Sequence, residues 1–232
     1  KTLFLAGTNG GVSEIQSTIG NATFTNMQIV KTGTGNWYLS GSNPFNGSIS
    51  VSNGALYFNS ISNDGATSSA LGVSLTNINL GNAATTGLIS YSGSAPGTIS
   101  ARAINLGSGS TGGGGISNTS TAATSTLLIS SNVINTAGSK VLFLGGQNTG
   151  INDIQSTLTN GLGTLALQKI DAGTWQISGA NTYSGGTTVT AGTLAGDTTS
   201  LQGNINNNAT VLFNQITDGS YAGQMTGSGE LQ

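Results

Sequence analysis

Few residues in this chain of 232 could carry out acid–base or metal chemistry. It has no histidine and no cysteine, which excludes Ser-His-Asp and Cys-His arrangements and removes the usual zinc ligands. Sugar hydrolysis by carboxylates alone needs two of them about 5–9.5 Å apart. Glu14 and Asp153 hold equivalent positions in a duplicated sequence, so in a stacked fold they would lie several coils apart. We predict no catalytic residues and no enzymatic activity.

Calcium and phosphate sites have little support in the sequence. Residues 112–115 are four glycines, but neither the Asp of a calcium-binding β-roll nor the Lys-Ser/Thr of a phosphate loop follows them. We expect this glycine run to be a surface loop. Asp64, Asp197 and Asp218 lie among Gly, Ser and Thr, where an Asx turn explains each of them. We predict no metal ligands, no cofactor-binding residues and no cofactor.

Two pairs of aromatic residues recur at the same spacing. Trp37 is followed eight residues later by Phe45, and Trp175 is followed at the same distance by Tyr183. Because the pairs recur with the duplication, the favoured interpretation is structural, with each tryptophan packed at the rim of the fold and the second aromatic covering the next coil. A sugar-stacking platform is the alternative.

Two tyrosines and two lysines are further candidates for contact with a ligand. Tyr38 and Tyr91 are less tied to the duplication than the paired aromatics, and we expect them to be better placed for exposed contacts. Lys31 and Lys169 each precede a tryptophan by six residues. We expect both lysines to be solvated, and contact with an acidic glycan is the alternative.

The elements that would position these residues come in two related copies. Residues 1–5 read KTLFL and residues 140–144 read KVLFL, and each copy continues through an acidic residue and IQST to a Trp segment and a closing G-x-L. Duplication of this kind indicates an array in which each unit packs on its neighbour. We predict one β-solenoid segment, residues 1–232, of a longer protein. Its duplicated parts are 1–58 and 140–196, its intervening coils are 59–139, and a further repeat starts at 197–232.

The hydrophobic pattern predicts short β-strands. Apolar residues alternate with polar ones over three to five positions, as in Ile49-Ser-Val51 and Leu142-Phe-Leu144, and Gly, Asn, Ser or Asp bound each run. A propeller would repeat every 40–50 residues or so, and a sandwich would have longer strands. We therefore predict an all-β fold, a parallel β-helix (β-solenoid) with about 20 residues per coil, along which Asn, Ser and Thr side chains form ladders.

Composition excludes two classes of partner. Only 5% of the residues are charged, and the five Lys and Arg residues are scattered singly, so no basic patch exists for nucleic acid. No apolar run approaches the roughly 18 residues that span a bilayer, so we predict no membrane insertion by this segment.

The second Trp segment has a specific pattern. Residues 169–194, KIDAGTWQISGANTYSGGTTVTAGTL, resemble the autotransporter-associated β-strand repeat, also called the passenger-associated transport repeat. The copy that begins at Lys31 is looser, with Pro44-Phe45 in place of Thr-Tyr. The resemblance implies a right-handed parallel β-helix exported to the bacterial surface. It implies no catalytic residues, because roles proposed for the family are secretion-linked folding, adhesion and surface structure.

The resemblance leads to the expected function. We predict a secreted bacterial cell-surface passenger, extracellular, with a structural or adhesive role and contacts to glycan or protein on host-cell, bacterial or matrix surfaces. One alternative is a subunit or repeat segment of an extracellular fibre or sheath, with end-to-end self-association. A second alternative is a polysaccharide-active β-helix enzyme, which would need a carboxylate cluster that the sequence does not show.

Overall fold

The computed structural model describes residues 1–20, 26–62, 68–107 and 111–232, and these residues form 23 strands in three parallel sheets. The N-terminal sheet contains β1 (Thr2–Leu5), β3 (Gln28–Lys31), β5 (Ile49–Val51), β7 (Ile78–Leu80), β10 (Ile104–Leu106) and β13 (Val133–Asn135). The central sheet contains β2 (Val12–Ile15), β4 (Asn36–Leu39), β6 (Gly54–Phe58), β8 (Thr86–Tyr91), β11 (Gly113–Asn118), β14 (Gly138–Gly145), β16 (Gly163–Lys169), β18 (Thr187–Val189), β20 (Ile205–Asn207) and β22 (Met225–Thr226). The C-terminal sheet contains β9 (Gly97–Ile99), β12 (Leu127–Ile129), β15 (Ile151–Ile154), β17 (Thr174–Ile177), β19 (Thr193–Gly196), β21 (Thr210–Phe213) and β23 (Glu230–Leu231).

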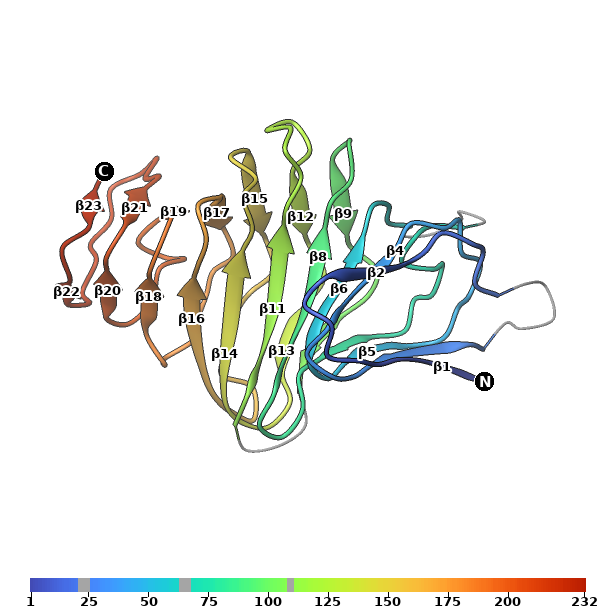
Figure 1. Cartoon of the computed structure of the whole chain (residues 1–232). Coiled ribbons are helices and arrows are strands. Elements are labelled where there is room, and N and C mark those ends of the chain that lie inside the picture. The colour runs from blue at the N-terminus through green and yellow to red at the C-terminus, as the bar shows by residue number, and fades with distance from the viewer. Residues whose placement is uncertain (21–25, 63–67, 108–110) are drawn as a thin grey trace.

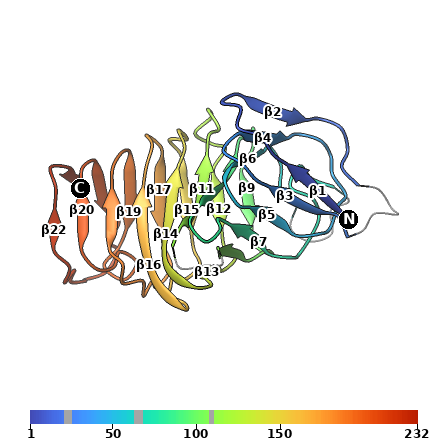
Figure 2. The ribbon, with the colours of Figure 1, turned by 60° about the horizontal axis from the view of Figure 1, so that its bottom comes forward.

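The strands stack coil upon coil into an elongated array, with the two termini at opposite ends (Figures 1 and 2). Each named strand pairs in parallel with a strand of the preceding or following coil, which confirms the predicted parallel β-helix. The described residues form no helix that is long and apolar enough to cross a membrane.

Coil length differs between the duplicated parts and the region between them. In the two Trp segments Trp37 pairs with Leu56 and Thr174 pairs with Thr193, so that these coils take 19 residues, close to the expected 20. Between the copies Gly54 pairs with Gly87, 33 residues further along. Most of this coil is the connection between β6, which ends at Phe58, and β7, which begins at Ile78. The coils of β7–β9, β10–β12 and β13–β15 each place a strand in all three sheets.

Inward-facing rows of aliphatic residues make the core. Ile49 pairs with Ile78, and Ile78 pairs with Ile104, all of them fully buried. Each side chain buried in this way contributes about 1.5–3 kcal/mol. On the outer side of the same strands an amide ladder runs along the stack: Asn105 donates to Asn79 at 3.0 Å. The predicted polar ladder is therefore present in the N-terminal sheet.

The glycine run is a strand, contrary to the prediction of a surface loop. Gly113–Gly115 open β11, whose six residues are all buried. A Cβ on Gly114 would lie 2.6 Å from Cδ2 of Leu106, which reaches across from β10 of the N-terminal sheet. A Cβ on Gly113 would lie 2.3 Å from the carbonyl oxygen of Val141. Gly114 faces the N-terminal sheet and Gly113 faces a neighbouring strand of its own sheet, and both approaches are too close for a side chain. This requirement for glycine prevails over its preference for turns.

Candidate functional site

The lysine that precedes each tryptophan lies inside the fold. Lys31 ends β3 and Lys169 ends β16, and both side chains are 0% exposed. Each ammonium donates to the carbonyl oxygens of the next two residues and of a residue 22 positions further on, at 2.5–3.0 Å. The predicted solvation of these lysines, and the alternative of contact with an acidic glycan, are therefore wrong. Backbone carbonyls of two successive coils converge there and substitute for water.

Burial also changes the acidity of these two lysines. It lowers the pKa of Lys31 below its usual value. It lowers the pKa of Lys169 to about 8, although the nearby carboxylate of Asp171 acts in the opposite direction. Both shifts follow from the cost of removing an ammonium group from water.

Each tryptophan lies on the strand that follows its lysine, Trp37 on β4 and Trp175 on β17. We call the turn between the lysine and the tryptophan the corner of the repeat. Trp175 Nε1 donates to the carbonyl oxygen of Gly145 at 2.8 Å, and Trp37 Nε1 donates to that of Ala6 at 3.0 Å. Trp175 is 0% exposed, so it packs in the interior, not at the rim as predicted. The aromatic residue that follows each tryptophan at eight residues is at most 2% exposed. The alternative of a sugar-stacking platform is therefore wrong for Trp175, Phe45 and Tyr183, whereas Trp37 is half-buried, as a position at the rim predicts.

The two acidic residues at matching positions are bonded to serines. Ser40 Oγ donates to Glu14 in the coil of β2, and Ser178 Oγ donates to Asp153 at 2.9 and 3.0 Å. Hydrogen bonds from Ser40 and Gln16 lower the pKa of the exposed Glu14. Burial raises the pKa of Asp153 even though Ser178 bonds to it. The two carboxylates lie in different sheets, several coils apart as predicted.

The sequence predicts turns for the other three carboxylates, those of Asp64, Asp197 and Asp218. Asp197 accepts backbone N–H groups from Thr199 and Ser200, each at 2.8 Å, which confirms its Asx turn. Asp64 lies outside the described residues, and the turn role of Asp218 stays a prediction. Over the described part of the chain no group of three or more acidic residues could hold a metal ion.

The positive charges are almost all hidden. Lys31, Arg102, Lys140 and Lys169 are at most 1% exposed, and every one donates to backbone carbonyl groups. Of the five Lys and Arg residues, only Lys1 is exposed. Acidic side chains remain at the surface, so the outside of the described chain is neutral to negative.

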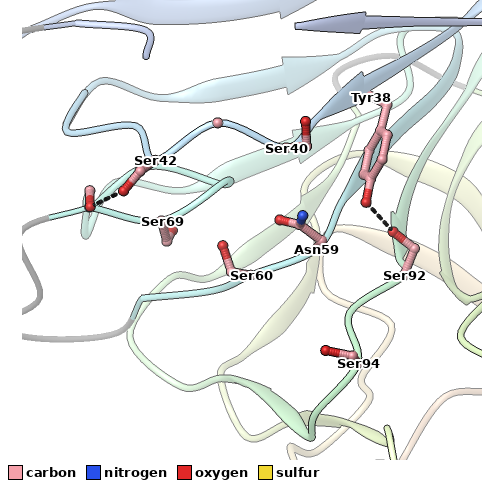
Figure 3. A pocket seen from close by; sticks show the side chains of 10 residues that line it. Tyr38, Ser40, Ser42, Asn59, Ser60, Ser69, Ser92 and Ser94 are labelled. Atoms are coloured by element: carbon pink, nitrogen blue, oxygen red, sulfur yellow. Dashed lines mark hydrogen bonds between the residues drawn. The ribbon is translucent and has the colours of Figure 1, made fainter. Parts of the chain in front are cut away.

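A polar groove opens where β4, β6 and β8 end on the outer side of the central sheet (Figure 3). Its volume is about 500 Å³. Because neighbouring strands are parallel, the residues after their carboxyl ends meet at one edge. Residues 40–42 follow β4, residues 59 and 60 follow β6, and Ser92 and Ser94 follow β8. Ser68 and Ser69, which lie further along the connection from β6 to β7, complete the lining, which contains Tyr38 and otherwise only Ser, Asn and Gly.

Hydrogen bonds fix part of this lining and leave part of it available. Ser92 Oγ donates to Tyr38 Oη at 3.2 Å, which connects the coil of β8 to the coil of β4 across β6. Ser42 and Ser68 bond to each other through their hydroxyl groups. Among the described residues, none bonds to the side chain of Asn59 or of Ser94. The groove therefore offers an unused amide and an unused hydroxyl, which can both donate and accept.

An apolar hollow of about 260 Å³ adjoins the groove. It is lined by Val12, Tyr38, Tyr57 and Ser92. Tyr38 and Tyr57 are paired in register on β4 and β6, so that their side chains stand next to each other on the outer face of the sheet. Tyr38 and Ser92 border both the polar groove and the apolar hollow, which makes one continuous site with an aromatic and a hydroxyl-lined part.

The passenger-associated-transport-repeat family model matches this chain twice, at residues 29–57 and 167–195. The chain carries two passenger-associated-transport repeats. A curated relative, the Adhesin BmaC autotransporter of Brucella suis biovar 1 (strain 1330), is 34% identical over 96 residues, which cover 39% of this chain and 3% of that protein. The chain thus spans a small part of the length of this relative. No solved structure matches the chain.

The transport repeats supply the corners, and the groove lies partly outside them. The lysine and tryptophan of each corner belong to the matched residues, as do Tyr38 and Tyr57. Asn59, Ser92 and Ser94 come after the first repeat. The second repeat has Gln176 at the position of Tyr38 and Ala195 at the position of Tyr57, so it does not reproduce the aromatic part of the site.

Sequence reasoning found one of the groove residues and missed others. Tyr38 lines the groove as expected of an exposed contact, but Tyr91 is 3% exposed and the prediction for it is wrong. Its hydroxyl donates to the carbonyl oxygen of Ala95, and its ring packs 5.6 Å from that of Phe58. Tyr91 lies two residues after Ile89, in the inward-facing row of β8. The alternation of inward and outward side chains along a strand could therefore have predicted that Tyr91 is buried. Asn59 had no comparable signal, because small polar residues follow nearly every strand.

Proposed function

We propose that this chain is part of a bacterial passenger that is secreted or displayed at the cell surface, where it has an adhesive and structural role. The groove at the ends of β4, β6 and β8 is the contact site. Two transport repeats and the likeness of 96 residues to an adhesin autotransporter support this proposal. The observation that carries it is the tyrosine-lined groove, which sits on the outer face of a rigid sheet.

The rest of the molecule suits a rod that presents such a site. The lysine and tryptophan of the first repeat hold together the coils beneath the groove. These coils pack closely at Gly41, where a Cβ would lie 2.5 Å from the carbonyl oxygen of Ser17. The proposed activity is binding without catalysis, because no histidine or cysteine is present and the two carboxylates at matching positions do not face each other.

The test uses the full-length protein on its own bacterium. An antibody against this segment should label intact cells, and cells that carry Tyr38→Ala should lose most of their attachment to host cells or matrix. Phe143→Ala is the matched control, since Phe143 is a half-buried aromatic of the same sheet that lies outside the groove. Unlabelled cells would contradict the surface location, and equal attachment of both variants would contradict the contact site. Filaments under negative stain would favour the fibre alternative.

A further inference from the structure

The groove lacks charge, and this limits what it can bind. No Lys, Arg, Asp or Glu is among its lining residues. Its nearest carboxylate, that of Glu14, accepts a hydrogen bond from Ser40 of the lining, and that bond helps to keep it ionised by lowering its pKa. Four of the five cations of the chain are buried in backbone contacts elsewhere. An anionic ligand would meet one negative charge and no exposed positive partner, which disfavours it.

The polar groups of the groove match a ligand that is rich in hydroxyl groups. Asn59 and Ser94 have side chains that no described residue bonds, and Ser60 Oγ accepts only the N–H of Ala70 at 2.8 Å. Hydroxyls and an amide can donate and accept at once, as the hydroxyls of a sugar do. Such groups set the orientation of a ligand, whereas apolar contact supplies most of its affinity.

The apolar contact is available beside them. Tyr38 and Tyr57 stand on adjacent strands and line the apolar hollow, and the hydroxyl of Tyr38 is already held by Ser92. A ring fixed in this way loses little side-chain entropy when a ligand packs on it. Two other polar hollows, of about 340 and 290 Å³, contain no aromatic residue. The combination of ring and hydroxyls distinguishes the Tyr38 groove from these two.

A peptide partner is less well matched to this place. Peptides that bind a β-sheet commonly add a strand to a free edge. Here β4 is paired with β2 and β6, and β8 is paired with β6 and β11, so none of the strands that form the groove has an open edge.

We propose that the Tyr38 groove binds a neutral oligosaccharide, with one sugar ring packed on Tyr38 and Tyr57 and the next bonded by Asn59 and Ser94. This inference rests on the proposed function, since it names the ligand class of the same site. The bound oligosaccharide would cross the ends of β4, β6 and β8, so that each of these three coils contributes to the contact.

The test is titration calorimetry of the 232-residue chain with neutral and acidic probes. Cellohexaose, an N-acetylglucosamine hexamer and a mannose hexamer are the neutral probes, and a heparin hexamer and an oligogalacturonate are the acidic ones. We expect at least one neutral probe to bind and neither acidic probe to bind. Tyr38→Ala should weaken binding by about tenfold or more, and Asn59→Ala by about threefold to tenfold.

Matched variants separate loss of contact from loss of fold. Tyr38→Phe keeps the ring and should keep most of the affinity, and Phe143→Ala should bind as the unchanged chain does. Circular dichroism reports whether each variant is folded. The proposal is overturned if no neutral probe binds, if the acidic probes bind better, or if Tyr38→Ala and Phe143→Ala behave alike.

A competition experiment distinguishes this inference from the proposed function. If Tyr38→Ala cells lose attachment but a neutral oligosaccharide in solution does not compete with the unchanged cells, the groove is an adhesive site with another ligand class. If Tyr38→Ala cells still attach, the proposed function itself fails at this site.

Discussion

The two transport repeats have the same corners and different outer faces. In each, a buried lysine donates to three backbone carbonyls and a tryptophan donates to a carbonyl of the preceding coil. Outward positions differ: Tyr38 and Tyr57 of the first repeat correspond to Gln176 and Ala195 of the second. Inward residues are constrained by packing, whereas outward residues are free to make a site. The comparison therefore places the proposed site at outward positions where the two repeats differ.

The repeats also occupy different sides of the array. The first repeat places β3 and β5 in the N-terminal sheet and β4 and β6 in the central sheet. The second places β16 and β18 in the central sheet and β17 and β19 in the C-terminal sheet. The same arrangement of lysine and tryptophan thus forms between the N-terminal and central sheets in the first repeat and between the central and C-terminal sheets in the second.

Among the predicted variants, the largest loss of stability and the largest difference between the two repeats are expected when the tryptophans are replaced. We expect Trp175→Ala to lower the free energy of unfolding by about 3–5 kcal/mol, because this side chain is completely buried. Trp37→Ala should lower it by only about 1–2 kcal/mol, because Trp37 is half-buried. Urea unfolding followed by circular dichroism measures both. Equal losses would mean that burial does not distinguish the two corners.

The buried lysines should instead behave alike. Lys31→Met and Lys169→Met each leave three carbonyl groups without a charged donor, and each should cost about 2–3 kcal/mol in the same unfolding assay. Lys140→Met is the control, because Lys140 Nζ bonds to one carbonyl group, that of Thr111, and should cost less. A large cost for only one of the two repeat lysines would show that the corners differ in strength.

The pH dependence should come mainly from the second repeat. The pKa of Lys169 in the folded chain is about 8, below its ordinary value of 10.5. Between these values the unfolded chain holds more protons, so the free energy of unfolding should rise as pH increases through this range. The rise should become much smaller in Lys169→Met and change less in Lys31→Met, whose lysine has a pKa that is also lowered. Thermal melts from about pH 8 to pH 9.5, below the ordinary titration of tyrosine, measure it; a rise that Lys169→Met leaves unchanged would contradict the assignment.

The smallest effects on stability are expected at Glu14 and Asp153, the two acidic residues at matching positions of the duplication. Glu14→Gln should leave stability almost unchanged, because Glu14 is exposed. Asp153→Asn should stabilise slightly near neutral pH, by less than about 1 kcal/mol, because burial raises the pKa of this carboxyl and so disfavours its ionised form. Chemical unfolding at pH 7 compares the two variants, and destabilisation by Asp153→Asn would show that the bond from Ser178 outweighs the cost of burial.

Much of the fold could be predicted from the sequence, and little of the site. The alternation around Ile49 and Val51 predicts a short strand with two inward side chains, and both are fully buried. The same logic failed for Gly113–Gly115, because strand periodicity does not show where a neighbouring strand or sheet comes so close that glycine is required. At the groove the sequence indicated Tyr38 but not Asn59, because only the register of β4, β6 and β8 places the residue after β6 beside Ser40 and Ser92.

By itself the sequence determined the local features: strands, turns, and the order of residues within each transport repeat. These follow from strand periodicity and turn chemistry, which act over a few residues. The tertiary structure decided which lysines are buried, which sheet each repeat occupies, and which polar residues share a groove. Those outcomes depend on carbonyls and strand ends about 20–33 residues away along the chain, which come together only when the register of neighbouring coils is fixed.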